Sequence, residues 1–209
     1  MTEKTKAKRT VIIITVVAVL IGGACLVLAN YDRLFEKARV PAESKIYLDR
    51  FFYEPDYSKS LREMEGYGDY LELDRLFRYK KGNVSLGLTK EDVANYSPDV
   101  RFFYNLIEVV RDGDTDSYNS MFTKKYLDTN GEKEDFTPQM IYDVVLEYQS
   151  TSSKKGITTY GYDLSYRIYR NDGTFRNDIY SDETNTQYIE IDDSEGEFKI
   201  SSVSYYIPE

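Results

Sequence analysis

The sequence predicts an α+β protein, in which an N-terminal transmembrane helix precedes a curved antiparallel sheet packed against helices. Three observations lead to this prediction. An uncharged apolar run comes first, an apolar stripe of helical period lies near the middle, and a two-residue alternation of apolar and polar side chains dominates the last third. With 209 residues, the chain has room for one ordinary domain and an appendage. We divide it into a cytoplasmic tail (1–10), a transmembrane signal anchor (11–29), a membrane-proximal segment or small subdomain (30–97) and an α+β domain (98–209).

The anchor prediction depends on the uncharged run from Val11 to Ala29. As a helix, this run is about 28 Å long, which matches the hydrocarbon core of a bilayer. Two alternatives remain: a signal peptide cleaved after Ala29, and lipidation at Cys25. We favour the uncleaved anchor because the run is longer than the apolar part of most signal peptides, and because it continues beyond Cys25.

The orientation of the anchor is not decided by counting cations, since four Lys or Arg residues flank the apolar run on each side. The short tail and the long polar remainder favour a cytoplasmic N-terminus and a C-terminal domain outside the cell. We therefore expect a single-pass protein of a bacterial cell membrane.

Composition excludes several classes of function. The formal net charge is −9, and the anionic surface that this implies makes nucleic acid an unsuitable partner. The chain has no histidine, and its single cysteine lies in the apolar run, so catalytic histidines, disulfides and imidazole or thiolate metal sites are excluded. Residues 112–123 begin like a calcium loop, but Ser117 stands where Gly is needed and Thr123 where a bidentate Glu is needed. We predict no metal site, no cofactor and no catalytic residue.

Residues 31–41 continue the helical pattern until Pro41, which should end it. Residues 42–97 mix short helical patterns with glycines and many aromatic side chains. We expect this segment to pack on the main domain or to form a small subdomain, since it is too aromatic to be simply disordered.

The main domain should open with helices. An apolar stripe from Phe102 to Val110 predicts a helix that starts near Asp99 and ends before Gly113. A second helix, capped by Asp114 or Thr115, should continue to residue 127. Its inward-facing side chains would be Tyr118, Met121, Phe122 and Tyr126. A third short helix is expected from "TPQMIYDVV", with Thr137 as its N-cap and Pro138 at its first position.

Everything after Lys155 is expected to be strand. The alternation from residue 160 to 169 predicts a half-buried strand, and Asp172-Gly173 in a type I′ turn would pair it with residues 174–180. In that register Tyr166 faces Ile179, and Arg167 faces Asp178; a three-residue loop would instead mix apolar and charged partners. In the last strand the apolar set shifts by one residue, which predicts a bulge near Ser201-Ser202.

This register divides the tyrosines into two groups. Tyr160, Tyr162 and Tyr166 point inward, where they fill the core or ring a ligand pocket. The outward group is a candidate surface for a protein partner, and it comprises Arg167, Tyr169, Arg176, Asp178 and Tyr180.

The order of helices followed by long strands, together with "FFYNLIEVVRDGDTDSYNSMFTKKYL" at residues 102–127, resembles the nuclear transport factor two-like (cystatin-like) superfamily of α+β cone folds. The resemblance covers residues 99–209. It implies a conical sheet around a pocket, which in that superfamily serves both enzymes and non-catalytic binding proteins. With an N-terminal anchor, the chain also looks like the scaffold proteins of bacterial secretion and sporulation channels.

We therefore expect non-covalent binding or assembly by a domain outside the cell, with the membrane, other envelope proteins or a second copy as partners. The alternative is a small-ligand-binding or isomerase-like enzyme that uses the cone pocket. Such an enzyme needs a carboxylate base near a hydrogen-bond donor. The only acid in the first strand, Asp163, points to the outer face in this register.

Overall fold

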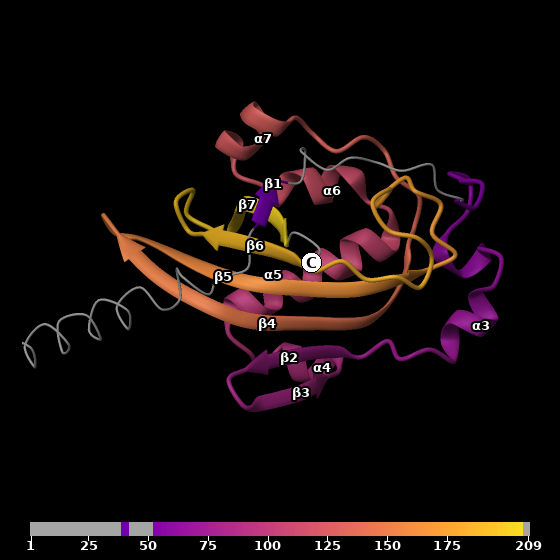
Figure 1. Ribbon diagram of the computed structural model, residues 1–209, viewed down its shortest axis with the longest axis horizontal. Helices are drawn as coiled ribbons and strands as arrows, with labels where there is room; N and C mark the ends of the chain where they lie inside the picture. The colour runs from indigo at the N-terminus through magenta and orange to yellow at the C-terminus, as the bar shows by residue number, and fades with distance from the viewer. Residues whose placement is uncertain (1–38, 42–51, 207–209) are drawn as a thin grey trace, which may run out of the picture. The chain divides into compact units, whose positions relative to one another are not determined.

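The computed structural model describes residues 39–41 and 52–206, which belong to one compact unit (Figure 1). The predicted tail and signal anchor lie outside the described residues. Within the described ranges, no helix has the length and apolar character needed to cross a bilayer.

The fold is α+β, as predicted, with one curved sheet and several helices (Figure 1). In the described part of the chain, seven strands lie in the order β1-β7-β6-β5-β4-β2-β3. The strands are β1 (Arg39–Pro41), β2 (Phe77–Lys81), β3 (Val84–Leu88), β4 (Met140–Lys154), β5 (Ile157–Tyr169), β6 (Gln187–Asp192) and β7 (Lys199–Tyr206). Neighbouring strands are antiparallel except β2 and β4, which are parallel. The sheet is therefore mixed, and the prediction of a purely antiparallel sheet was wrong.

The helices are short apart from one. They are a 3₁₀ turn (Leu61–Glu63), α3 (Tyr67–Leu71), α4 (Lys90–Val93), α5 (Pro98–Asp112), α6 (Thr115–Ser120) and α7 (Lys124–Asn130). The prediction of α5 is confirmed. Its apolar stripe, which includes Phe103, Ile107 and Val110, is buried against one face of the sheet (Figure 1).

Residues 52–97 pack on the main domain. Their strands β2 and β3 extend the sheet beyond β4. From α3, the buried Tyr70 donates its hydroxyl to the carbonyl of Ile141, at 2.8 Å. The segment is thus part of the same hydrophobic core rather than a separate layer.

The predicted second helix is interrupted after Ser120. The amide of Thr123 donates to the carbonyl of Ile200 at 2.9 Å, and the amide of Ile200 donates to Met121 at 2.8 Å. Residues 121–123 thus bond to strand β7 instead of continuing the helix. The start was predicted correctly, since the Asp114 carboxylate accepts from the amide of Ser117 and caps α6.

The predicted third helix is not formed. Thr137 and Pro138 lie in an extended segment that leads into β4, and the buried Thr137 hydroxyl donates to the Asp172 carboxylate. A register irregularity after Tyr142, with Asp143 at a φ of 53°, breaks the alternation of β4 near its start. Because of that break, the sequence pattern did not predict the strand.

The prediction of a hairpin at Asp172-Gly173 was also wrong. β5 instead forms its hairpin with β4 through the two-residue turn Lys155-Gly156, and it pairs with β6 on its other side. Residues 170–186 form a loop, and Tyr166 is not paired with Ile179. The Asp172 carboxylate accepts from the amide of Thr174 at 3.0 Å, a local turn that redirects the chain without pairing two strands.

The bulge in the last strand is confirmed. Glu190 faces Ser202 while Ile191 faces Ile200, so Ser201 is the additional residue on β7. Ile200 lies in the core before the bulge, and Val203 and Tyr205 line the interior after it.

Candidate functional site: a pocket lined by Lys133 and Arg176

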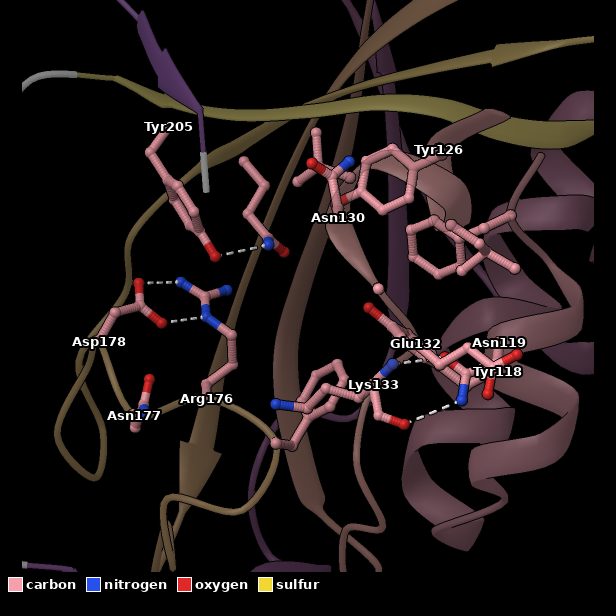
Figure 2. A pocket seen from close by; sticks show the side chains of 16 residues that line it. Tyr118, Asn119, Tyr126, Asn130, Glu132, Lys133, Arg176, Asn177, Asp178 and Tyr205 are labelled. Atoms are coloured by element: carbon pink, nitrogen blue, oxygen red, sulfur yellow. Dashed lines mark hydrogen bonds and ion pairs between the residues drawn. The ribbon is translucent and has the colours of Figure 1, made fainter. Parts of the chain in front are cut away.

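A pocket of about 280 Å³ opens between helices α6 and α7 on one side and the 170–186 loop on the other (Figure 2). Strands β6 and β7 contribute Gln187, Val203 and Tyr205. The pocket is therefore built from segments that are distant in sequence, which the sheet and the helices bring together.

Aromatic side chains form one wall. Tyr118 lies between Phe122 and Phe175, with ring centroids 5.1 and 5.4 Å away, and Phe122 contacts Tyr126 at 4.8 Å. The contact between Tyr118 and Phe175 is edge-to-face, a favourable arrangement for aromatic pairs. This wall offers ring faces and edges to an apolar or planar ligand.

The 170–186 loop supplies Phe175 to the aromatic wall and Arg176, Asn177 and Asp178 to the rest of the pocket lining, and it is held together by Asn171. This side chain is fully buried and donates to the carbonyls of Arg176 and Ile179 at 2.8 and 2.9 Å. Because two carbonyls of the loop share one amide donor, the segment that carries Arg176 is fixed in position.

Arg176 forms a buried ion pair with Asp178 (Figure 2). Their atoms meet at 2.5 Å (Nε to Oδ1) and 2.7 Å (Nη2 to Oδ2), and the two side chains are only 5% and 7% exposed. The guanidinium also donates to the Tyr166 hydroxyl at 3.0 Å and lies 5.2 Å from the centre of the Tyr205 ring. Two parallel hydrogen bonds give this pair a fixed orientation.

A chain of hydrogen bonds continues from Arg176 to the sheet. The Tyr166 hydroxyl donates to Oε1 of Gln187 at 3.3 Å, and Nε2 of Gln187 donates to the Tyr205 hydroxyl at 3.1 Å. Burial raises the pKa of both phenols, so they stay protonated at neutral pH.

Lys133 supplies a second cation. Its backbone is fixed by Asn119, whose side chain accepts from the Lys133 amide at 2.8 Å and donates to its carbonyl at 2.9 Å. The side chain reaches across the pocket toward the segment that carries Arg176 and Asn177 (Figure 2). Among the described residues, no hydrogen bond or ion pair engages its ammonium group. Burial lowers the pKa of Lys133; the charge of Glu134 raises it in part.

No family model matches this sequence, and comparison with curated proteins and with solved structures found no match. The resemblance to the nuclear transport factor two-like superfamily therefore stays a prediction.

The three tyrosines predicted to bind a ligand do not meet in one pocket. Tyr166 lies beneath the pocket, in contact with Arg176, and lines a cavity of about 20 Å³ in the core. Tyr160 is half-buried and packs edge-on against Phe198, with ring centroids 5.6 Å apart. Only Tyr166 is therefore connected to the pocket.

Tyr162 takes part in a different contact, which the sequence did not reveal. It is fully buried, and its hydroxyl donates to the carboxylate of Asp99, in the first turn of α5. Burial and this hydrogen bond raise the pKa of the Tyr162 phenol far above its ordinary value. The pair joins helix to sheet inside the core, and neither residue lines the 280 Å³ pocket.

The outward surface predicted for the other five residues is not formed, because the hairpin that defined it is absent. Arg176 and Asp178 are buried at the pocket, as described above. Arg167 is half-exposed and lies 3.4 Å from the Asp143 carboxylate, while Tyr169 packs over Gly66. Tyr180 is half-buried in the loop.

Sequence reasoning missed the residues that give the pocket its charge. Lys133 lies in "NGEKEDF", where acids and a lysine alternate as in any exposed loop, so nothing in the sequence distinguished it. Asn119 was equally ordinary. The inward positions of Tyr118, Phe122 and Tyr126 were predicted, and their aromatic character was the available signal.

Proposed function

We propose that this domain binds a small organic carboxylate, non-covalently, in the pocket between α6, α7 and the 170–186 loop. The observation that carries the proposal is the half-buried Lys133 side chain in the pocket wall, whose ammonium forms no hydrogen bond or ion pair with another described residue. A buried charge without a partner is unfavourable, and a bound anion would compensate it.

The ligand should carry a single negative charge. The Arg176 charge is already compensated by Asp178 through two hydrogen bonds, whereas no other residue in the described ranges forms an ion pair with Lys133. Arg176 itself lines the pocket, and its contact with Tyr166 helps to hold it in place.

The ligand body should be small and apolar or aromatic. The pocket volume of about 280 Å³ is just below the usual range for ligand sites, roughly 300 to 1,000 Å³. The ring of Tyr118 and the side chains beside it can pack against a planar group.

Binding is favoured over the isomerase-like alternative by the state of the nearby acids. Proton abstraction needs a carboxylate that can reach the substrate. Of the two acids that line the pocket, Asp178 is committed to Arg176 and to the side-chain amide of Asn185, and Glu132 is exposed to solvent.

We further propose that the chain presents this domain outside a bacterial cell as a single-pass membrane protein of the cone-like class. The uncharged run at residues 11–29 supports the anchor, and the curved sheet with α5 across one face supports the cone. The proposal includes other envelope proteins as partners of this anchored domain.

The binding proposal is tested with the purified full chain in mild detergent. Benzoate serves as the anionic probe and benzamide as its neutral counterpart of nearly equal shape, with binding followed by calorimetry or by ligand-observed NMR. We expect benzoate to bind more tightly than benzamide, and Lys133→Gln to weaken benzoate by about tenfold, equivalent to about 1.4 kcal/mol.

The matched control is Lys125→Gln, on the exposed surface of α7 and outside the pocket. It should leave benzoate binding unchanged. Equal affinity for benzoate and benzamide, or equal loss in the two lysine variants, would contradict the proposed role of Lys133.

A further inference from the structure

Strand β3 forms one edge of the sheet, and its outer side is not covered by another described strand. Its sequence, Val84-Ser-Leu-Gly-Leu88, contains no charge and no proline. Val84 and Leu86 are 55% and 42% exposed. Natural sheets usually protect an edge with charges, proline or a bulge, and β3 has none of these.

The hairpin turn determines which backbone groups of β3 face outward. Gly82 and Asn83 form a two-residue turn between the paired residues Lys81 and Val84, with Gly82 at a φ of 56°. In an antiparallel pair, the bonding direction alternates along the strand. The even-numbered residues of β3 therefore bond to β2, while the N–H and C=O groups of Ser85 and Gly87 point away from the sheet.

We propose that β3 pairs antiparallel with β3 of a second copy of this chain, so that two sheets join edge to edge. The pairing is centred on Leu86, which lies opposite Leu86 of the other copy. Val84 then faces Leu88, and Ser85 faces Gly87. Apolar side chains meet on one face and small ones on the other, and Ser85 and Gly87 exchange the outward-pointing hydrogen bonds.

A second copy fits this edge for two reasons. The strand is complementary to itself in the antiparallel register, and a symmetric contact repeats every favourable pair twice. The charges beside the strand also suit this pairing. Lys80 and Lys81 precede the turn at the start of β3, while Glu91 and Asp92 lie in the first turn of α4, just after the end of β3. Antiparallel pairing brings the basic end of one copy to the acidic end of the other.

The apolar surface beside β3 supports the same occupant. Val84 and Leu86 lie on the face of the sheet that carries Tyr79, whose ring is 6.0 Å from that of Tyr96. Pairing would therefore extend the hydrophobic core from one copy into the next.

Cysteine cross-linking tests the register. The full chain with Cys25→Ser provides a background without thiols, into which Leu86→Cys is introduced, in detergent and under mild oxidation. Leu86 faces Leu86 of the other copy, and a non-hydrogen-bonded pair brings the two Cα atoms to about 4.5 Å, within reach of a disulfide. We expect most of the Leu86→Cys protein to become a covalent dimer.

Val84→Cys is the matched control, since Val84 is also exposed and lies two residues away on the same face. Val84 faces Leu88 of the other copy rather than Val84 of the other copy, so the Val84→Cys protein should cross-link at least fivefold less. Equal cross-linking at the two positions, or none at residue 86, would overturn the proposal.

A second measurement does not require a disulfide. Leu86→Lys should lower the mass measured by light scattering to that of a single chain. Leu71→Lys, which alters a similarly exposed leucine on α3, should not change it. Lys133→Gln should leave cross-linking at residue 86 unchanged, so that this proposal and the binding proposal can fail separately. A mass that is unaffected by Leu86→Lys would count against β3 pairing.

Discussion

Arg176 and Asp178 show how strongly a single residue pair can depend on its surroundings. Both charges are almost completely removed from water, so each is tolerable only while the other is present. The pair also holds Tyr166 and contacts the ring of Tyr205, and it therefore connects the stability of the loop to the shape of the pocket.

Asp178→Ala should destabilise the domain by roughly 3–5 kcal/mol, because it leaves the buried Arg176 charge without its partner. Urea unfolding followed by circular dichroism measures the change. Asp128→Ala, at an exposed position on α7, should change the stability by less than about 0.5 kcal/mol. Similar values for the two variants would show that the ion pair does not form in solution.

Lys133 gives ligand binding a pH dependence of known sign. Burial lowers the pKa of its ammonium below the ordinary value of 10.5, and a bound carboxylate raises it again by stabilising the charged form. Benzoate affinity should therefore be highest below the lowered pKa and fall as the pH rises through it. Calorimetry across the alkaline range measures this fall, which should disappear in Lys133→Gln. An affinity that stays constant up to pH 10.5 would contradict the lowered pKa.

At the scale of the elements, the C-terminal end of α5 lies very close to the backbone of Pro138. Gly113 has a φ of 70°, and a Cβ atom at this position would lie 2.7 Å from the backbone nitrogen of Pro138. The helix therefore ends against the segment that leads into β4. Glycine satisfies both the backbone conformation and the lack of space.

Gly113→Ala should consequently cost more than the roughly 1–2 kcal/mol expected for a left-handed backbone alone. Gly156→Ala is the control, because Gly156 also has a positive φ, of 82°, but no atom lies within 4 Å of an added Cβ. Thermal or urea unfolding of both variants separates the two effects. Equal destabilisation would mean that Pro138 moves aside at little cost.

The elements also show which parts of the fold were predictable. The helix α5 and the strands β6 and β7, with the bulge at Ser201, follow from the periodicity of their own sequences. The strand β4 and the real hairpin did not, since an irregularity near Asp143 disrupts the pattern and Asn-Asp-Gly forms a local turn. Local chemistry determined that a turn occurs there, but tertiary pairing determined which strands meet.

The candidate site was predictable only where it is apolar. Its aromatic wall follows from the inward faces of two predicted helical turns. Its charges do not, because the place of Lys133 depends on Asn119, and that of Arg176 on the whole loop. Such contacts between distant segments leave no periodic signal in the sequence.

For the molecule as a whole, buried phenols are the main titratable groups of the interior. Burial raises the pKa of the phenols of Tyr118, Tyr162, Tyr166 and Tyr205. An acid whose pKa is higher in the folded state than in the unfolded state stabilises the fold below the unfolded pKa. That stability is lost as the pH rises toward the folded pKa.

The free energy of unfolding should therefore decrease steeply above about pH 10, where unfolded tyrosines ionise. Urea midpoints measured from neutral to strongly alkaline pH test this. Tyrosinate absorbance from the buried phenols should appear together with the loss of circular dichroism. Ionisation of all tyrosines near pH 10 in a protein that keeps its secondary structure would contradict it.

The additional residue in β7 changes the course of the strand rather than the set of side chains that point inward. Before Ser201 the even-numbered Ile200 points inward, and after it the odd-numbered Val203 and Tyr205 do. Deleting Ser201 would leave only Ser202 between Ile200 and Val203, so that all three inward-facing side chains would still point inward in a regular pairing with β6. The deletion would instead remove the local bend and extra twist that a bulge introduces. Related chains that lack the additional residue should thus keep the same core residues but have a straighter strand beside the pocket.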